Sequence, residues 1–387
     1  MSRDELLDRL MPCMKCGLCR ASCPIFTEVG VETSVARGKV RLIKGLLRGE
    51  FSPDDDIASR IYLCLLCKQC TTTCPSGVEV DDIIAGGREY LVSQGYAPEP
   101  MRILSAALTE ARNITGEPRA NRTLWMDDLE TRPRQVEPGH TAGVDIIYYT
   151  GCVAALFPTV WAIPQSLVQL FRRAGLNFAV LGGEEWCCGY PMMGGGITAE
   201  LKDFVSHNVG AIEETGARTL VTGCPSCYHA WKYDYPRIVG RDLPFEVVHS
   251  SQLLEGLIQQ RALALGPVDS TVTYHDPCDL GRKSGVFDAP RNIIRSIPEL
   301  QFLEMAKSRD NAICCGGGGN LEMLFPDTTE AVASRKISQI REVGASTVVS
   351  SCQQCKRTIA AAVRREKARV RVLDIAELLL KSVQAAE

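Results

Sequence analysis

GARTLVTGCPSC, residues 216–227, is followed 128 residues later by a similar stretch, GASTVVSSCQQC, at residues 344–355. In both stretches a short apolar run typical of a β-strand leads into a C-x2-C pair. The cysteine pairs of two upstream CCG tripeptides are offset by 127 residues, and Cys152 and Cys278 by 126. A repeat of this size indicates a duplicated domain rather than a solenoid.

Strand and helix patterns alternate in both copies. Helical patterns occupy residues 161–176 and 201–216 of the first copy and the corresponding parts of the second. The expected strands are at residues 144–152, 177–183 and 218–223, and at residues 271–278, 301–305 and 346–352. Such alternation predicts α/β domains with parallel sheets. The cysteines would then lie at the carboxyl ends of strands, where open α/β sheets bind their ligands.

Ten cysteines form two sets of five with matching spacing: Cys152, Cys187, Cys188, Cys224 and Cys227, and Cys278, Cys314, Cys315, Cys352 and Cys355. Tetrahedral zinc uses four ligands, whereas two adjacent cysteines can reach different irons of a larger or opened iron–sulfur cluster. Glycines 189, 194–196 and 316–319 would let backbone N–H groups approach that cluster. A lone cysteine is often an apolar filler, but ten in matched spacing favour a ligand role.

The remaining eight of the 18 cysteines form two runs of C-x2-C-x2-C-x3-C-P, at residues 13–24 and 64–75. In this motif three thiolates hold one [4Fe–4S] cube, and the fourth usually ligates the other cube. The predicted ligand sets are Cys13, Cys16, Cys19 and Cys74 for one cube, and Cys64, Cys67, Cys70 and Cys23 for the other. Two zinc sites are the alternative, but zinc usually takes two distant C-x2-C hooks.

Four segments are expected along the chain. Forty residues separate Cys23 from Cys64, which is too many for a compact β-hairpin ferredoxin, and helical patterns at residues 35–50 and 78–95 favour an all-helical two-cluster module. The fold class is therefore α plus α/β, with a helical module followed by two duplicated domains. The predicted boundaries are 1–111 for the module, 112–142 for a linker, 143–265 for the first α/β domain and 266–387 for the second.

Composition excludes several other classes. A net charge of −3 gives no electrostatic reason to expect nucleic-acid binding, and no apolar run has the length of a membrane span. The N-terminal MSRDELLDRLMP carries acidic residues and no long apolar core, so no secretory signal is expected. We expect a reducing cytoplasm, where abundant cysteine indicates metal or redox chemistry, and membrane association only through a partner.

A chain with clusters alone needs an electron donor and an acceptor elsewhere. The sequence contains neither G-x-G-x-x-G after a strand nor a P-loop, so we expect no flavin or nicotinamide site in this chain. A multisubunit complex with a flavoprotein partner is therefore predicted.

His275, in the HDPC stretch before Cys278, is the candidate catalytic residue. It could donate to a cluster sulfur or protonate a leaving thiolate, or it could make only a structural hydrogen bond at a strand end. His229, just after Cys227, has the same two interpretations. Arg282 and Lys283 could bind an anionic substrate or offset cluster charge, or could begin a solvated helix.

These motifs make the chain resemble the CCG-domain iron–sulfur oxidoreductases. That family includes heterodisulfide reductase subunits, the iron–sulfur subunits of glycolate oxidase, lactate utilisation and anaerobic glycerol-3-phosphate dehydrogenase, and a subunit of benzoyl-CoA reductase complexes. The fusion of a ferredoxin module to a CCG pair is most similar to the D-type heterodisulfide reductase subunit. Because both five-cysteine motifs are complete, the resemblance implies two noncubane [4Fe–4S] clusters beside the two cubes.

The resemblance leaves two functional hypotheses. In the first, the CCG clusters form a catalytic centre that cleaves or forms a disulfide or another thiol-coupled bond. In the second, all clusters are an electron relay for a separate catalytic subunit, such as a flavin 2-hydroxyacid dehydrogenase or a benzoyl-CoA reductase. A zinc-stabilised interaction scaffold is a third, non-redox alternative, which the cluster motifs disfavour.

Overall fold

The computed structural model describes residues 2–136 and 143–387. Residues 2–111 fold into helices, with no strand in this part of the chain. They are α1 (Arg3–Leu10), α2 (Leu18–Ala21), α3 (Pro24–Val29), α4 (Ala36–Arg48), α5 (Asp55–Tyr62), α6 (Gln69–Thr72), α7 (Val80–Ser93) and α8 (Glu99–Ala111). The expected all-helical module is therefore confirmed, with its two long predicted helices present as α4 and α7.

Helix α4 packs closely against α7 through a glycine. The buried face of α4 carries Val40, Ile43, Leu46 and Leu47, at the spacing of one helix face. A Cβ at Gly87 of α7 would lie 2.5 Å from Cδ1 of Ile43, so a larger residue there would force the Ile43 side chain to move. This contact sets the relative positions of α4 and α7, between which the loops that carry the second run of cysteines lie.

The first α/β unit is a four-stranded parallel sheet in the order β2-β1-β3-β4. Its strands are β1 (Ile146–Tyr149), β2 (Phe178–Val180), β3 (Thr219–Thr222) and β4 (Glu246–His249). Its main helices are α9 (Cys152–Leu156), α10 (Ala162–Arg173), α11 (Tyr190–Gly195), α12 (Leu201–Thr215), α13 (Pro225–His229), α14 (Tyr235–Val239) and α15 (Ser250–Gln259). The three predicted strands are present, and β4 is an additional one.

The second unit repeats this order as β6-β5-β7-β8, again all parallel. Its strands are β5 (Ser270–His275), β6 (Leu300–Phe302), β7 (Thr347–Ser350) and β8 (Arg371–Asp374). Its helices are α16 (Asp288–Ser296), α17 (Leu321–Leu324), α18 (Pro326–Val343), α19 (Gln353–Arg365) and α20 (Ile375–Ala385). The duplication predicted from the repeat is therefore confirmed at the level of topology.

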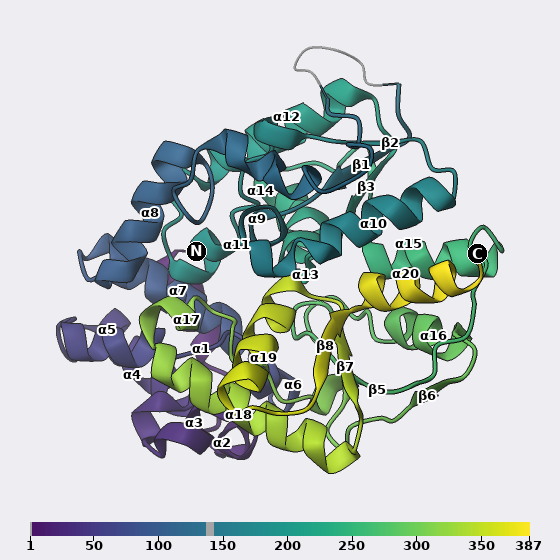
Figure 1. Cartoon of the computed structure of the whole chain (residues 1–387). Coiled ribbons are helices and arrows are strands. Elements are labelled where there is room, and N and C mark those ends of the chain that lie inside the picture. The colour runs from purple at the N-terminus through teal and green to yellow at the C-terminus, as the bar shows by residue number, and fades with distance from the viewer. Residues whose placement is uncertain (1, 137–142) are drawn as a thin grey trace.

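The two α/β units share one hydrophobic core. Helix α10 packs on α20 and α15 on α16, and Figure 1 shows α10, α15 and α20 between the two sheets. This core includes Leu167 and Phe171 of α10 and Leu379 of α20, all fully buried. Because about 25 cal/mol is gained per Å² of apolar surface buried, such a core holds the two units as one body.

The segment after α8 packs onto the first unit. A 3-10 helix, η2 (Arg119–Met126), places Trp125 in the shared core with no exposed surface. Beyond it, the backbone N–H of Val136 donates to the carbonyl oxygen of Val180 at 2.9 Å, which extends the edge of β2. Residues 137–142 of the predicted linker lie outside the described residues, and the division at residues 111, 142 and 265 stays a prediction.

Both glycine runs of the α/β units lie against the helical module. A Cβ at Gly196 would lie 2.5 Å from the backbone nitrogen of Glu89, and one at Gly319 2.4 Å from the carbonyl oxygen of Cys64. Arg88 of α7 is fully buried there and donates to the carbonyls of Gly194, Gly319, Tyr62 and Cys64. These glycines therefore make room for the module's backbone, a role that the sequence did not suggest.

We expect Gly319→Ala to destabilise the protein by about 2–4 kcal/mol, since alanine at φ +62° costs about 1 kcal/mol and forcing atoms into a filled space costs about 1–3 kcal/mol. Gly344→Ala is the matched control, because Gly344 has φ +74° and nothing within 4 Å of its added Cβ. The measurement is the denaturant midpoint of each variant. Equal losses in both variants would show that the contact with Cys64 carries no stability.

Candidate functional site

The eight cysteines of the helical module line two cavities. Cys13, Cys16 and Cys19 share the first with Cys70 and Cys74. The second is lined by Cys23, Cys64, Cys67 and Cys70. Each cavity thus combines three cysteines of one run with the last cysteine of the other, and Cys70 reaches both. This arrangement is compatible with the predicted exchange of Cys23 and Cys74, which stays a prediction.

The first five-cysteine site, defined by Cys152, Cys187, Cys188, Cys224 and Cys227, lies at the carboxyl ends of β1 and β3. Four of its thiols are buried, and Cys224 is partly exposed. Hydrogen bonds from Cys187 and Cys227 lower the pKa of the Cys188 thiol to about 6. Cys152 is different, because its contact with Cys187, followed by burial, raises its pKa well above the ordinary value.

The second site, defined by Cys278, Cys314, Cys315, Cys352 and Cys355, lies at the ends of β5 and β7, and all five thiols are buried. Sγ of Cys315 and Sγ of Cys355 are 3.3 Å apart, and the backbone N–H of Cys355 donates to Sγ of Cys352 at 3.3 Å. Contact with Cys314 and then Cys355 lowers the pKa of Cys315 well below its ordinary value. Both sites therefore bring together all the cysteines that the spacing had grouped.

The second site touches the helical module. Cys67 of the module lies in one buried cluster with Cys278 and Cys314 of the second site, and the interaction with the Cys314 thiol lowers the pKa of Cys67 to about 6. Arg282 secures this junction by donating to the carbonyl oxygens of Cys67 and Ala312, each at 2.7 Å. The guanidinium is therefore a tether between the two cysteine groups, and its charge also acts on the thiols of Cys67, Cys278 and Cys314.

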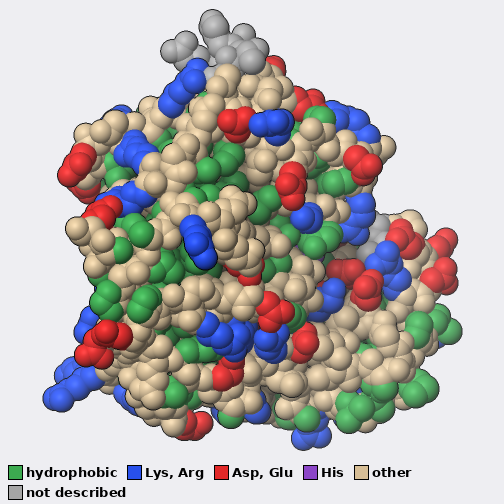
Figure 2. Space-filling view, turned by 90° about the vertical axis from the view of Figure 1, so that its right-hand side faces the viewer, with side chains coloured by type: hydrophobic (Ala, Val, Ile, Leu, Met, Phe, Trp, Pro, Cys, Tyr) green, Lys and Arg blue, Asp and Glu red, His purple; other side chains and the backbone are tan. Residues whose placement is uncertain are grey.

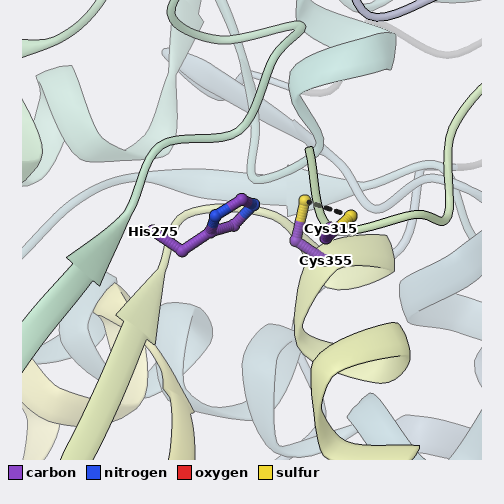
Figure 3. A group of neighbouring side chains, drawn as sticks. All are labelled: His275, Cys315 and Cys355. Atoms are coloured by element: carbon purple, nitrogen blue, oxygen red, sulfur yellow. Dashed lines mark hydrogen bonds between the residues drawn. The ribbon is translucent and has the colours of Figure 1, made fainter. Parts of the chain in front are cut away.

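His275 ends β5 with its imidazole beside the sulfurs of Cys315 and Cys355, and the ligand atoms of all three lie within 4.8 Å of one another (Figure 3). The ring is buried, and neither nitrogen makes a hydrogen bond to another described residue. Burial lowers the pKa of His275, which favours the neutral ring. The structural hydrogen bond considered for this residue is not present among the described residues.

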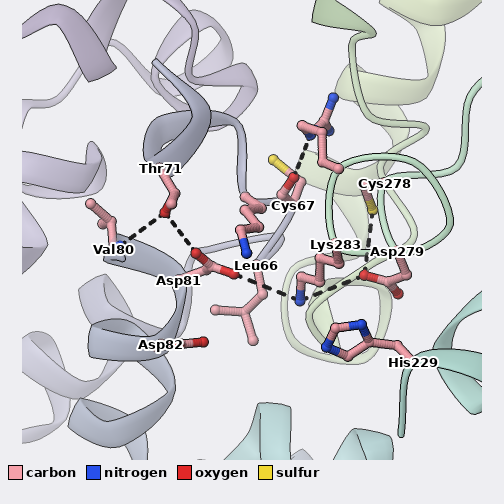
Figure 4. A network of polar contacts seen from close by, with 12 residues as sticks. Leu66, Cys67, Thr71, Val80, Asp81, Asp82, His229, Cys278, Asp279 and Lys283 are labelled. Carbon is pink, nitrogen blue, oxygen red and sulfur yellow. Dashed lines mark hydrogen bonds and ion pairs between the residues drawn. The ribbon is translucent and has the colours of Figure 1, made fainter. Parts of the chain in front are cut away.

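Lys283 lies in a buried polar network between the module and both α/β units (Figure 4). Its Nζ is 3.6 Å from Asp279 and 4.0 Å from Asp81 of α7, and it donates to the hydroxyl of Tyr190 at 2.7 Å. His229 borders the network through Ser284, with 3.1 Å between its Nδ1 and Oγ. Two carboxylates already lie beside Lys283 and balance its charge, which favours a structural role for the lysine over anion binding.

The donor sets fit iron–sulfur clusters. All 18 cysteines are free thiols, and thiolate is the ligand that these clusters require. A Cβ at Gly151, whose φ is +80°, would lie 3.2 Å from Sγ of Cys227 and fill the space beside the first set of sulfurs. Free thiols grouped around spaces that exclude a side chain are what a cluster site needs.

A buried ion pair beside the first site was not found from the sequence. Arg122, in the segment expected to be a linker, donates to Sγ of Cys152 at 3.4 Å and pairs with Glu185. Glu185 also accepts the backbone N–H groups of Thr150 and Gly151, at 2.8 and 2.9 Å. The separation of Arg122 from the cysteines along the sequence does not predict this contact, because the contact depends on how η2 packs onto the first α/β unit.

Sequence families match the same parts of the chain. The 4Fe-4S dicluster domain matches residues 9–78, and the CCG cysteine-rich domain matches residues 146–232 and 272–360. Fold and sites thus define an iron–sulfur oxidoreductase subunit. The chain belongs to the CCG-domain iron–sulfur oxidoreductases.

Curated relatives support this assignment. The D-type subunit of the dihydromethanophenazine:CoB–CoM heterodisulfide reductase of Methanosarcina barkeri is 32% identical over 97% of this chain and 95% of its own length. The B-type subunit of the fumarate reductase (CoM/CoB) of Methanothermobacter marburgensis is 29% identical over 96% of this chain and 72% of its own length. EtfAB:quinone oxidoreductase of Syntrophomonas wolfei is 28% identical over 84% of this chain and 46% of its own length.

Among solved structures, a hypothetical protein from Helicobacter pylori has a similar fold, with a TM-score of 0.58 and 12% identity. The match covers 88% of this chain and 66% of that one. Within residues 2–136 and 143–387, no helix is both long and apolar enough to cross a membrane.

Proposed function

We propose that the chain is the iron–sulfur subunit of a multisubunit, heterodisulfide-reductase-like oxidoreductase that exchanges electrons with a flavoprotein partner. Cys13, Cys16, Cys19 and Cys74, and Cys64, Cys67, Cys70 and Cys23, would each hold a cubane [4Fe–4S] cluster. The two five-cysteine sites would each hold a noncubane [4Fe–4S] cluster, and the chain itself would bind no flavin. The free thiols fit a reducing cytoplasm, with membrane association only through a partner.

The burial of Cys67 and Cys314 in one cluster, with Arg282 joining their two loops, carries this proposal. Clusters, when bound, supply the one-electron chemistry, and the polypeptide supplies a short, ordered path between them. Cys67 belongs to the cavity that also contains Cys23, and Cys314 to the second five-cysteine site. Sulfur ligands of neighbouring sites that pack in one buried cluster support electron exchange between the helical module and the CCG pair.

Two roles for the five-cysteine sites follow from their surroundings. Cys224 is the one residue of the ten that is only partly buried, so a sulfur substrate would approach the first site from its side, where Ser226 donates to Asp279 at 2.7 Å. At the second site, His275 would hold a proton beside Cys315 and Cys355 for thiol chemistry. Burial of the other nine thiols instead favours the alternative of a pure relay.

Thiol binding separates the two roles. EPR spectra of the oxidised protein, purified without oxygen, are recorded with and without a small thiol, and with its S-methylated thioether as control. For catalytic CCG sites we expect a new paramagnetic signal with the thiol alone. The absence of any such signal in protein with its full iron content would overturn the catalytic role and leave the relay. Figure 2 shows acidic and basic side chains interspersed on one face of the molecule.

A further inference from the structure

The two five-cysteine sites differ at one pair of equivalent, fully buried positions. Gly216 and Gly344 end the helices α12 and α18, and counting back eight residues from each gives Asn208 and Lys336. Neither side chain has any exposed surface. The first site therefore has a neutral amide where the second has a primary amine.

Asn208 is fully occupied by neutral partners. Its amide nitrogen donates to the carbonyl oxygen of Cys187 at 3.1 Å and to the hydroxyl of Tyr235 at 3.0 Å, and its oxygen accepts the backbone N–H of Trp186 at 3.3 Å. The residue thus holds the backbone of the cysteine pair without adding charge. The other cation at this site, Arg122, is paired with Glu185.

Lys336 has no such pairing. Its Nζ donates to Oε1 of Gln339 at 2.8 Å, and the sulfur of Met305 is 4.0 Å away. Both partners are neutral. The nearby carboxylate, Asp276, is already held by both nitrogens of the Arg291 fork, at 2.7 and 2.8 Å, and by the backbone N–H of Arg309.

The charges that act on Lys336 come chiefly from the cysteines. Helix α18 packs on the turn that follows Cys314 and Cys315, since a Cβ at Gly316 would lie 2.7 Å from the carbonyl oxygen of Thr329. Burial lowers the pKa of Lys336 to about 8, and the charges of Cys314 and Cys315 oppose that shift ahead of Asp276. Arg282 is a second cation near these thiolates and increases the positive character of the site. The two neighbours of the amine, Met305 and Gln339, also line a surface groove of about 460 Å³. The carboxylates of that groove are Glu304, which Arg291 holds, and Glu342.

An unpaired buried ammonium is costly, and a negative group beside it offsets that cost. A cluster held by five thiolates is such a group, and it becomes more negative when it is reduced. A fixed positive charge stabilises the reduced form and so raises the reduction potential.

We propose that Lys336 makes the second five-cysteine site the stronger electron acceptor of the two, by placing near Cys314 and Cys315 a positive charge that no carboxylate pairs, whereas Arg122 at the first site is paired with Glu185. The inference rests on the proposed clusters. Lys336 acts as a positioning and tuning residue, and it touches no substrate. Cys67 of the helical module lies beside the same site, so an electron that passes from the module would remain on the cluster that it reaches first.

The test is an EPR-monitored redox titration of wild type, Lys336→Gln and Lys336→Arg, with the two CCG signals assigned by their loss in Cys227→Ser and Cys355→Ser. An iron content of about 16 per chain is established first. A lower content would show that the proposed clusters are absent, which is a failure of the proposed function and not of this inference. We expect Lys336→Gln to lower the midpoint potential of the second site alone and Lys336→Arg to preserve it. The unmoved first site is the control within the molecule.

Two results would overturn the inference. One is a second-site potential in Lys336→Gln that is unchanged, or that shifts together with the first site. The other is a purely structural role for Lys336. If Lys336→Gln loses iron from the second site, Lys336→Met, which is neutral and of similar length, is compared with Lys336→Arg. Loss of the same iron in Lys336→Met but not in Lys336→Arg would assign Lys336 a structural role.

Discussion

Replacing Cys67 by alanine is expected to remove one cube and to separate the second five-cysteine site from the helical module. Cys67 lines the cavity shared by Cys23, Cys64 and Cys70, and it lies in one buried cluster with Cys314. With one of four cube ligands gone, iron should fall from about 16 to about 12 per chain. Reduced flavodoxin should then no longer reduce the CCG clusters, whereas dithionite, which is small and needs no docking, should still do so.

Cys16→Ala is the matched variant. Cys16 is exposed and lines the other cavity, so its loss should also remove about four irons. The packing of Cys67 beside the second site remains in that variant, so spin–spin broadening between the neighbouring clusters should persist. If Cys67→Ala keeps both the broadening and the flavodoxin-driven reduction, electrons do not pass through this junction.

Arg88→Met is expected to have the largest effect on stability. The guanidinium is fully buried and donates to four carbonyl oxygens at 2.6–3.0 Å, two in the module and one in each glycine run. Each buried acceptor left without a donor costs about 1–3 kcal/mol, so the loss should be at least about 4 kcal/mol. Denaturant unfolding and limited proteolysis would report it, the latter as release of the helical module.

Arg88→Lys and Arg102→Met complete this experiment. A single ammonium lacks the planar fork that reaches four acceptors, so lysine should recover only part of the stability. Arg102 is an exposed residue of α8 that pairs with Glu99, and its replacement should change the free energy of unfolding by less than about 1 kcal/mol. A loss in Arg88→Met no larger than that in Arg102→Met would mean that Arg88 does not join the three parts.

Local patterns in the sequence predicted the frame of the fold. The apolar runs at residues 144–152 and 218–223 became β1 and β3, and the cysteines that follow them lie at the predicted sheet edge. Strands β4 and β8 were not predicted. Each has only four residues, begins with an exposed charged residue, Glu246 or Arg371, and leads to no cysteine, so no motif drew attention to it.

The charged residues around the sites could not be predicted, because their roles depend on distant contacts. Arg88 occurs in a helix pattern in which arginine is an ordinary surface residue, yet its partners are up to 231 positions away. Lys336 also looks like a solvated helix residue until α18 packs against Gly316, directly after Cys315, and buries it. The glycines at residues 194–196 and 316–319 show the same limit. The sequence suggested that they let backbone approach a cluster, and the structure adds that they make room for the backbone of the module.

The most direct test of a four-cluster protein is the iron content of material purified without oxygen, measured together with acid-labile sulfide. Four [4Fe–4S] clusters predict about 16 irons and about 16 sulfides per chain. Around eight of each would mean that the five-cysteine sites hold no clusters, and would contradict the central claim even if both cubes were intact.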